Sequence, residues 1–227
     1  MRRAYIESHV PFDEAMEMAL DWAGDTATIH APDTAVIDEN DLEDLGVPVT
    51  AVSSRSRLHG LARGTVIGAF LNLKEVLEVE RSPHVDGLVV VPAHGPVRYA
   101  ESVPSHAPWI TAYDVERLGG EDIPRTPLAS APIKAAIAGL TGLAVTNQGL
   151  IDKRERSAVV HALTYLRAHG VELVPDAVMV EALRNEWGGT GPEDAHAIAV
   201  ELNSGKHLKY DRTRLRPERL AEWARAR

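Results

Sequence analysis

The feature that most constrains the fold is an unbroken apolar run, Leu88-Val89-Val90-Val91, between Gly87 and Pro92. A strand with one solvated face alternates apolar and polar side chains, whereas a strand covered on both faces is apolar throughout. Sheets with both faces covered are mostly the parallel sheets of α/β proteins, which have helices on either side. The segment Gly87–Pro92 therefore predicts a central strand of a parallel sheet.

Four further segments of the first half are predicted strands, namely Ala4–His9, Thr26–His30, Val47–Val52 and Thr65–Leu71. A helix is expected after Pro11, with a buried face at the i, i+3, i+4, i+7 positions Ala15, Met18, Ala19 and Trp22. Shorter helices are expected at Glu39–Leu45 and Leu73–Arg81. Alternation of strands and helices predicts an α/β domain in residues 1–120, Rossmann-like, with a mostly parallel sheet of about five strands.

The second half has a different pattern. The stretch Gly119–Pro132 carries three prolines and two glycines, and residues 121–132 are predicted to be a linker. Beyond them, apolar residues recur at helical spacing in five segments, Ile133–Leu143, Lys153–His169, Asp176–Trp187, Glu193–Asn203 and Pro217–Ala226. We therefore expect an all-α domain in residues 133–227, with Trp187 and Trp223 in its core.

Composition excludes several kinds of chemistry. The chain has no cysteine, which excludes disulfides, thiolate nucleophiles and cysteine-ligated metals. Its start, Met1-Arg2-Arg3, is not followed by the apolar run of a signal peptide, and no segment has the length and hydrophobicity of a membrane span. A cytoplasmic protein is expected, with no membrane partner. The excess of arginine over lysine and the abundant alanine indicate a GC-rich bacterial genome.

Polar side chains follow each predicted strand of the first half. They are His9, His30, Ser53 with Ser54, Asn72 and His94. Ligands of open parallel sheets bind at the carboxyl ends of the strands, and imidazole suits proton transfer near neutral pH. His94 and His30 are therefore the predicted catalytic residues. The alternative is that polar residues stand there only because strands end where apolar sequence ends.

The segment from Ser53 to Gly64 concentrates cations and hydroxyls within an acidic half. Arginine guanidinium groups and serine hydroxyls bind phosphate or carboxylate oxygens. An anion-binding site is therefore predicted from Ser53, Ser54, Arg55, Arg57, His59 and Arg63, together with Asn72. The segment lacks the P-loop pattern, and the alternative is a solvated loop whose arginines pair with nearby acids.

Other motifs with a known chemistry are absent from the sequence. There is no dinucleotide-binding glycine fingerprint, no G-x-S-x-G nucleophile elbow and no close histidine spacing for a metal. No metal site is predicted, and no cofactor is indicated.

Charge is distributed unevenly along the chain. The net charge is −9, yet Ser204–Arg227 carries eight Lys and Arg against three Asp and Glu. This basic tail offers a nucleic-acid surface through Lys206, Lys209, Tyr210, Arg212, Arg214 and Arg216. Equally, its cations could cover the acidic body of the same chain or of a second copy in a homo-oligomer. A helix–turn–helix ending at Trp187 is rejected, because its second helix would carry Asp176, Glu181 and Glu186 against one arginine.

Two functions remain open from the sequence. The first is binding of a small anionic, phosphate-bearing or nucleotide-like ligand at the strand ends, with acid–base or hydrolytic chemistry if the ligand reacts. The second is a non-enzymatic interaction or nucleic-acid-associated module that uses the helical half and the basic tail. Whether the protein is an enzyme is undecided by the sequence.

Overall fold

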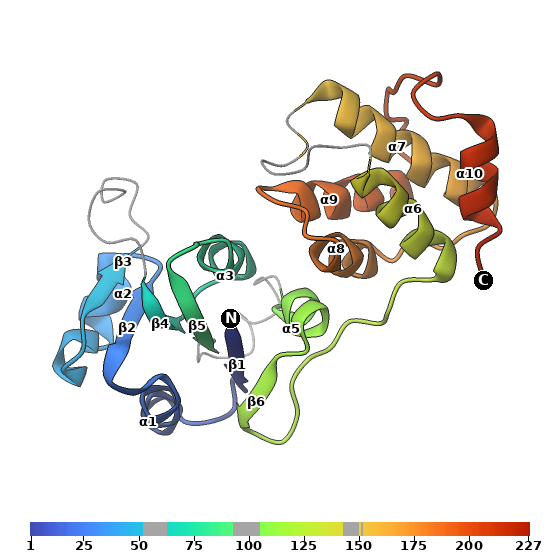
Figure 1. Cartoon of the computed structure of the whole chain (residues 1–227). Helices are drawn as coiled ribbons and strands as arrows, with labels where there is room; N and C mark the ends of the chain where they lie inside the picture. The colour runs from blue at the N-terminus through green and yellow to red at the C-terminus, as the bar shows by residue number, and fades with distance from the viewer. Residues whose placement is uncertain (52–62, 93–104, 143–149, 151) are drawn as a thin grey trace. The chain divides into compact units, whose positions relative to one another are not determined.

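The computed structural model describes residues 1–51, 63–92, 105–142, 150 and 152–227 (Figure 1). The chain forms two compact units, Met1–Arg125 and Thr126–Arg227. Among the helices of these residues, none combines the length and hydrophobicity that a bilayer-crossing segment needs.

The first unit is built on a parallel sheet of six strands. The strands are β1 (Arg2–Ile6), β2 (Ala27–Ala31), β3 (Val49–Ala51), β4 (Gly64–Ala69), β5 (Val85–Val91) and β6 (Glu116–Gly119). Their order is β3-β2-β4-β5-β1-β6, and every neighbouring pair is parallel. The predicted α/β fold with a parallel sheet is therefore confirmed, and the apolar run of β5 lies near the middle of the sheet.

Helices cover both faces of this sheet (Figure 1). On one face α1 (Phe12–Ala23) and α2 (Thr34–Glu39) share a core with alternate residues of the strands, such as Ile29, Ile67 and Val89. The other face carries α3 (Leu73–Glu80) and α5 (Ala107–Tyr113). Because helices cover both faces of the sheet, the loops that follow the strands converge at its carboxyl edge.

Strand β6 was not predicted from the sequence. Its residues Glu116-Arg117-Leu118-Gly119 lie just before the predicted linker, in a part of the chain where no strand was expected. The strand occupies the edge of the sheet, and two of its four residues are exposed. A short edge strand with charged side chains lacks the apolar signature of a central strand.

Two other predictions need correction. The expected helix Glu39–Leu45 is divided into α2, which begins after the N-cap Asp33, and a 3-10 turn η2 (Leu42–Leu45). In α1 the fully buried residues are Ala15, Met16, Ala19 and Ala23, whereas Met18 and Trp22 are only half-buried.

The second unit is helical. Its helices are α6 (Ala131–Thr141), α7 (Lys153–Ala168), α8 (Pro175–Arg184), α9 (Gly191–Asn203) and α10 (Pro217–Ala224). The first and last residues of each helix lie within three residues of the ends of the corresponding predicted segment. Trp187 and Trp223 are buried in one core with Val159, Leu163 and Ile198, so the helical half has the amphipathic packing that its periodicity predicts.

Candidate functional site

The carboxyl edge of the sheet has two switch points, one between β1 and β5 and one between β2 and β4. At each of them, adjacent strands lead to helices on opposite faces, α1 and α2 on one side and α3 and α5 on the other. Such points open a crevice in which α/β proteins bind ligands. Of the predicted site residues that the structure describes, His30 and Asn72 lie at the second switch point.

His30 is buried at the end of β2, with its side chain held by β3. Its Nδ1 lies 2.8 Å from Thr50 Oγ1, and that hydroxyl donates its single proton to the carbonyl of Ile29 at 3.1 Å. Nδ1 must therefore be the donor to Thr50, which leaves Nε2 as the basic nitrogen. Burial lowers the pKa of His30 below its ordinary value. The arrangement is that of a neutral imidazole with a fixed tautomer.

Asn72 has a structural role that the sequence analysis did not assign. Its Oδ1 accepts the amide of Glu75 at 3.1 Å, and Glu75 Oε2 accepts the amide of Asn72 at 2.8 Å. This reciprocal pair is a capping box that starts α3. Burial, together with the charges of Glu78 and Asp33, raises the pKa of Glu75. The described surroundings of Asn72 are acidic, which does not favour an anion.

The other predicted residues of this site are not brought together in the described part of the chain. Arg63 directly precedes β4 and lies at the amino edge of the sheet, about one strand length of 20 Å from the carboxyl edge. His9 is largely exposed, and its Nδ1 lies 2.7 Å from Glu7 Oε1. The remaining predicted residues, Ser53, Ser54, Arg55, Arg57, His59 and His94, lie outside the described residues.

A second pair of buried polar rings lies near the first switch point. His106 Nε2 donates to the carbonyl of Leu71 at 2.8 Å, and its ring lies 5.6 Å from that of Tyr5. Burial lowers the pKa of His106, whereas burial and the charge of Glu7 raise the pKa of Tyr5 to about 12. Both groups are neutral at physiological pH. No signal in the sequence joins residues 5, 71 and 106, so the prediction missed this pair.

Glu7 closes the loop that follows β6. Its Oε2 accepts the amides of Glu121 and Asp122 at 2.9 and 3.5 Å. The first of these bonds is the main reason why the pKa of Glu7 is lowered. A Cβ on Gly120, whose φ is +88°, would overlap the Glu7 side chain. Glu7 is therefore a structural acceptor rather than a free base.

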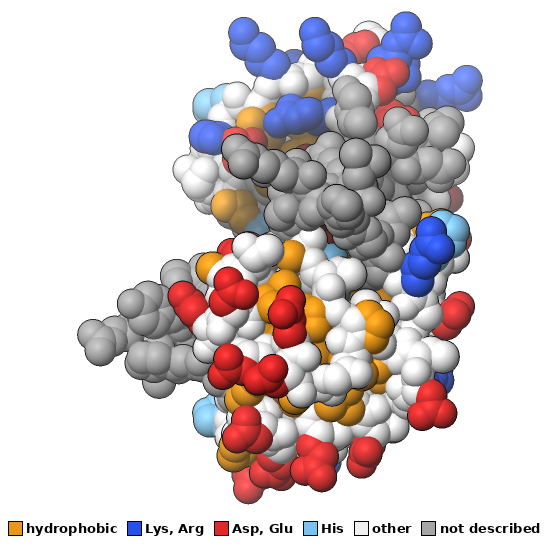
Figure 2. Space-filling model, turned by 90° about the vertical axis from the view of Figure 1, so that its left-hand side faces the viewer, with side chains coloured by type: hydrophobic (Ala, Val, Ile, Leu, Met, Phe, Trp, Pro, Cys, Tyr) orange, Lys and Arg blue, Asp and Glu red, His pale blue; other side chains and the backbone are white. Residues whose placement is uncertain are grey.

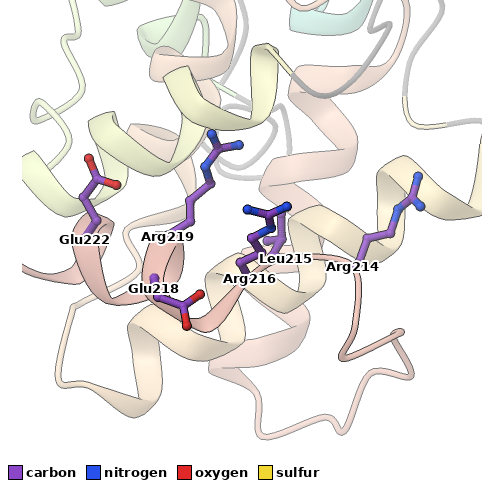
Figure 3. Close-up of a pocket in the computed structure, with 6 residues that line it drawn as sticks. All are labelled: Arg214, Leu215, Arg216, Glu218, Arg219 and Glu222. Carbon is purple, nitrogen blue, oxygen red and sulfur yellow. The ribbon is translucent and has the colours of Figure 1, made fainter.

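The helical unit carries the predicted nucleic-acid residues. We define the basic strip as Lys206, Lys209, Arg212, Arg214, Arg216 and Arg219, all of which are exposed. Three of its members line a surface hollow of about 690 Å³, together with Leu215, Glu218 and Glu222. In Figure 3 the guanidinium groups of Arg214, Arg216 and Arg219 point toward the same side.

Two of the predicted nucleic-acid residues, Lys206 and Tyr210, already have partners within the helical unit. Lys206 Nζ lies 2.6 Å from Glu201 Oε1, and Tyr210 stacks on His161 with ring centroids 5.0 Å apart. Tyr210 is thereby half-buried and is less available for stacking on a base than the sequence suggested. Within the described part of the chain, no ion pair engages Arg212, Arg214, Arg216 or Arg219.

The described residues contain no group of three or more His, Asp or Glu side chains placed to hold a metal ion. The chemistry that these positions support is therefore that of a buried neutral base in the first unit and of an exposed cationic surface in the second.

Comparison with known proteins gives one match. Residues 131–224 match a family model described as a domain of unknown function (DUF1889). No curated protein and no solved structure matches the chain. The match spans α6 to α10, which is less than half of the chain, and includes Arg214, Arg216 and Arg219 of the basic strip. The helical unit is thus similar to a domain whose function is not established.

Proposed function

We propose that the protein is a non-enzymatic binding protein whose helical unit holds a nucleic acid through the basic strip. The single observation that carries the proposal is the common orientation of Arg214, Arg216 and Arg219 around one hollow (Figure 3). Guanidinium groups without carboxylate partners can neutralise phosphates without first breaking an ion pair. The strip offers six exposed cations between Lys206 and Arg219, which suits a backbone of repeated phosphates better than a single small ion.

We expect Arg212→Ala, Arg214→Ala and Arg216→Ala, combined in one variant, to weaken binding of a labelled oligonucleotide and to flatten its salt dependence. If each arginine meets one phosphate, the slope of log K against log salt falls by about 2–3. Fluorescence anisotropy at a series of salt concentrations measures both quantities.

The matched control removes three exposed cations elsewhere, through Lys74→Ala, Arg154→Ala and Arg167→Ala. It makes the same change in net charge and should leave the slope near that of the unmodified protein. Equal losses in the two triple variants, or no binding at low salt, would contradict the proposal.

A second function is supported by the buried base at the sheet edge. We propose it as the alternative: binding of a small phosphate-bearing ligand beside His30, with proton transfer through Nε2. Its support is the fixed tautomer of His30 at a switch point between parallel strands. Asp33 and Glu75, which follow β2 and β4, are close enough for their charges to interact, so the proposal requires positive charge from Arg55 and Arg57.

A thermal-shift screen against nucleotides and sugar phosphates tests this alternative. A ligand present at a hundred times its Kd should stabilise the protein by about 2.7 kcal/mol. The gain should disappear in a variant with Arg55→Ala and Arg57→Ala, and should persist in the basic-strip variant. Indifference to every compound would remove the alternative.

For either function we propose the cytoplasm of a bacterium as the location. The support is compositional, namely the absence of cysteine and the preference for arginine and alanine.

A further inference from the structure

Helix α1 carries two parallel stripes of side chains that line one wall of a groove. Phe12, Met16 and Leu20 stand four residues apart and form an apolar stripe, and Asp13, Glu17 and Asp21 form an acidic stripe beside it. Residues at i and i+4 are neighbours on a helix surface. From Phe12 to Leu20 the apolar stripe rises by about 12 Å along the helix.

The facing wall comes from the segment that ends in η2. Asn40, Asp41, Asp44 and Leu45 face the two stripes of α1 across a groove of about 610 Å³. We call this the acidic groove. Its floor is apolar, with Phe12, Leu20 and Leu45 half-buried and Met16 fully buried. In Figure 2 Asp and Glu side chains spread over this unit with hydrophobic side chains visible between them.

The five carboxylates of the groove have no cation nearby in sequence. From Ala4 to Ser54 the chain has no lysine or arginine and twelve acidic residues, Glu7, Asp13, Glu14, Glu17, Asp21, Asp25, Asp33, Asp38, Glu39, Asp41, Glu43 and Asp44. Within the part of the chain that the structure describes, no ion pair engages any of the five. Carboxylates that repel one another across a groove lower the stability of the unit unless a cation covers them.

The kind of cation follows from the spacing. The described residues include no three carboxylates or histidines close enough to hold one metal ion. The negative charge is instead spread along both walls, over about two turns of α1, with apolar atoms between them. A single metal ion cannot contact all of these carboxylates. A helix with an apolar face and flanking cations can contact both the apolar floor and the carboxylates on the two walls.

We infer that the acidic groove docks a basic amphipathic helix of a partner protein, with the apolar face of that helix on Phe12, Leu20 and Leu45, the half-buried residues of the groove. The chain's own basic strip could pair with the five carboxylates at the rim of the groove. Its described residues form no exposed apolar face that could cover the groove's apolar floor. Leu215, Leu220 and Trp223 are buried in the helical core, and the half-buried Leu208 and Tyr210 pack against that core. A second copy would therefore offer charge without an apolar face.

The test uses the full-length protein and a fluorescent synthetic peptide of about five helical turns. Its leucines stand at i, i+4 and i+8 and its lysines on both flanks. A scrambled peptide of the same composition, with no amphipathic face, is the first control. Anisotropy should show saturable binding of the amphipathic peptide that weakens as salt rises, and at least about tenfold weaker binding of the scrambled one.

Three variants locate the site. Glu17→Gln with Asp21→Asn should weaken peptide binding about fivefold, since it removes two rim charges at exposed positions. Glu14→Gln with Asp25→Asn makes the same change in net charge outside the groove and should have no effect. Leu20→Gln should weaken binding even at high salt, because it removes an apolar contact with the peptide and leaves the charges of the groove unchanged. Circular dichroism checks that each variant keeps its helix content.

The inference is overturned if both peptides bind alike, because attraction would then be a matter of net charge. It is also overturned if the groove and control variants bind the peptide equally. Self-association in sedimentation velocity that Glu17→Gln with Asp21→Asn abolishes, with no peptide binding, would assign the groove to a second copy and not to a foreign helix. Each of these results leaves the oligonucleotide experiment on the basic strip unaffected.

Discussion

Replacing Glu80 by alanine is expected to destabilise the first unit by about 3 kcal/mol. We expect a smaller loss from alanine at any other single carboxylate of that unit. Glu80 is the last residue of α3, and its side chain is only 6% exposed. Oε1 accepts Arg3 Nη2 at 2.7 Å and Nε at 2.9 Å, and Oε2 accepts Trp109 Nε1 at 2.9 Å. One carboxylate therefore joins β1, α3 and α5.

The size of the effect comes from the groups left behind. Alanine would leave the Arg3 guanidinium without its anion and the indole N–H of the fully buried Trp109 without an acceptor. An unpartnered buried charge costs more than the lost bond itself. Arg3 is 24% exposed and lies over the ring of Tyr113 at 4.2 Å, so water and the ring recover part of the loss.

Urea denaturation followed by tryptophan fluorescence measures the change, and a loss of 3 kcal/mol should lower the midpoint by roughly 1–2 M. Glu80→Gln keeps one acceptor and should lose about half as much. Glu78→Ala, on an exposed position of the same helix, is the matched control and should change little. If Glu78→Ala and Glu80→Ala were equally mild, Glu80 would not connect the three elements.

The fold could be predicted from the sequence because its main signals are local. The apolar run of β5 and the spacing in α7 and α9 reflect burial on known faces, and the structure has these elements where the pattern places them. The spacing of apolar residues did not predict burial where burial depends on residues far away in the sequence. In α1 the sequence favoured Met18 and Trp22 as buried, but Trp22 lies beneath Arg2, whose guanidinium is 4.4 Å from the ring, at the margin of the sheet.

The candidate sites were less predictable, because a site depends on which residues the fold brings close together in space. Arg63 belonged to the predicted cationic loop, yet the direction of β4 places it at the amino edge. Tyr210 has the right chemistry for stacking on a base, but His161, forty-nine residues earlier, covers its ring. The tautomer of His30 depends on Thr50, which is in register with it on the neighbouring strand. None of these relations has a fixed spacing along the chain.

The second large effect is expected at the contact between α6 and α10. Trp223, only 5% exposed, packs against Gly139, where an added Cβ would lie 2.7 Å from Trp223 Cε2 and 2.8 Å from Nε1. Trp223→Ala should destabilise the helical unit by about 3–5 kcal/mol, through loss of buried area and the cavity that remains. Glycine inside a helix is unfavourable by about 1 kcal/mol relative to alanine, so Gly139 is explained by the indole that it accommodates.

This explanation predicts a change of sign in a double-mutant cycle. Gly139→Ala alone should destabilise the unit by about 1–2 kcal/mol, because the ring must move. In the Trp223→Ala background the clash is absent, and Gly139→Ala should instead stabilise by about 1 kcal/mol through helix propensity. Urea titration can follow Trp187, whose Nε1 donates to Thr141 Oγ1 at 2.7 Å in the same core.

Gly142→Ala is the control for this cycle, because a Cβ there meets nothing closer than 3.9 Å. Its effect should be the same in both backgrounds, since it does not involve the indole. If Gly139→Ala behaved as Gly142→Ala does, with no dependence on Trp223, the glycine would not be needed for the close approach of α10. A sign reversal confined to Gly139 would show that α10, which carries Arg219 of the basic strip, is positioned by this contact.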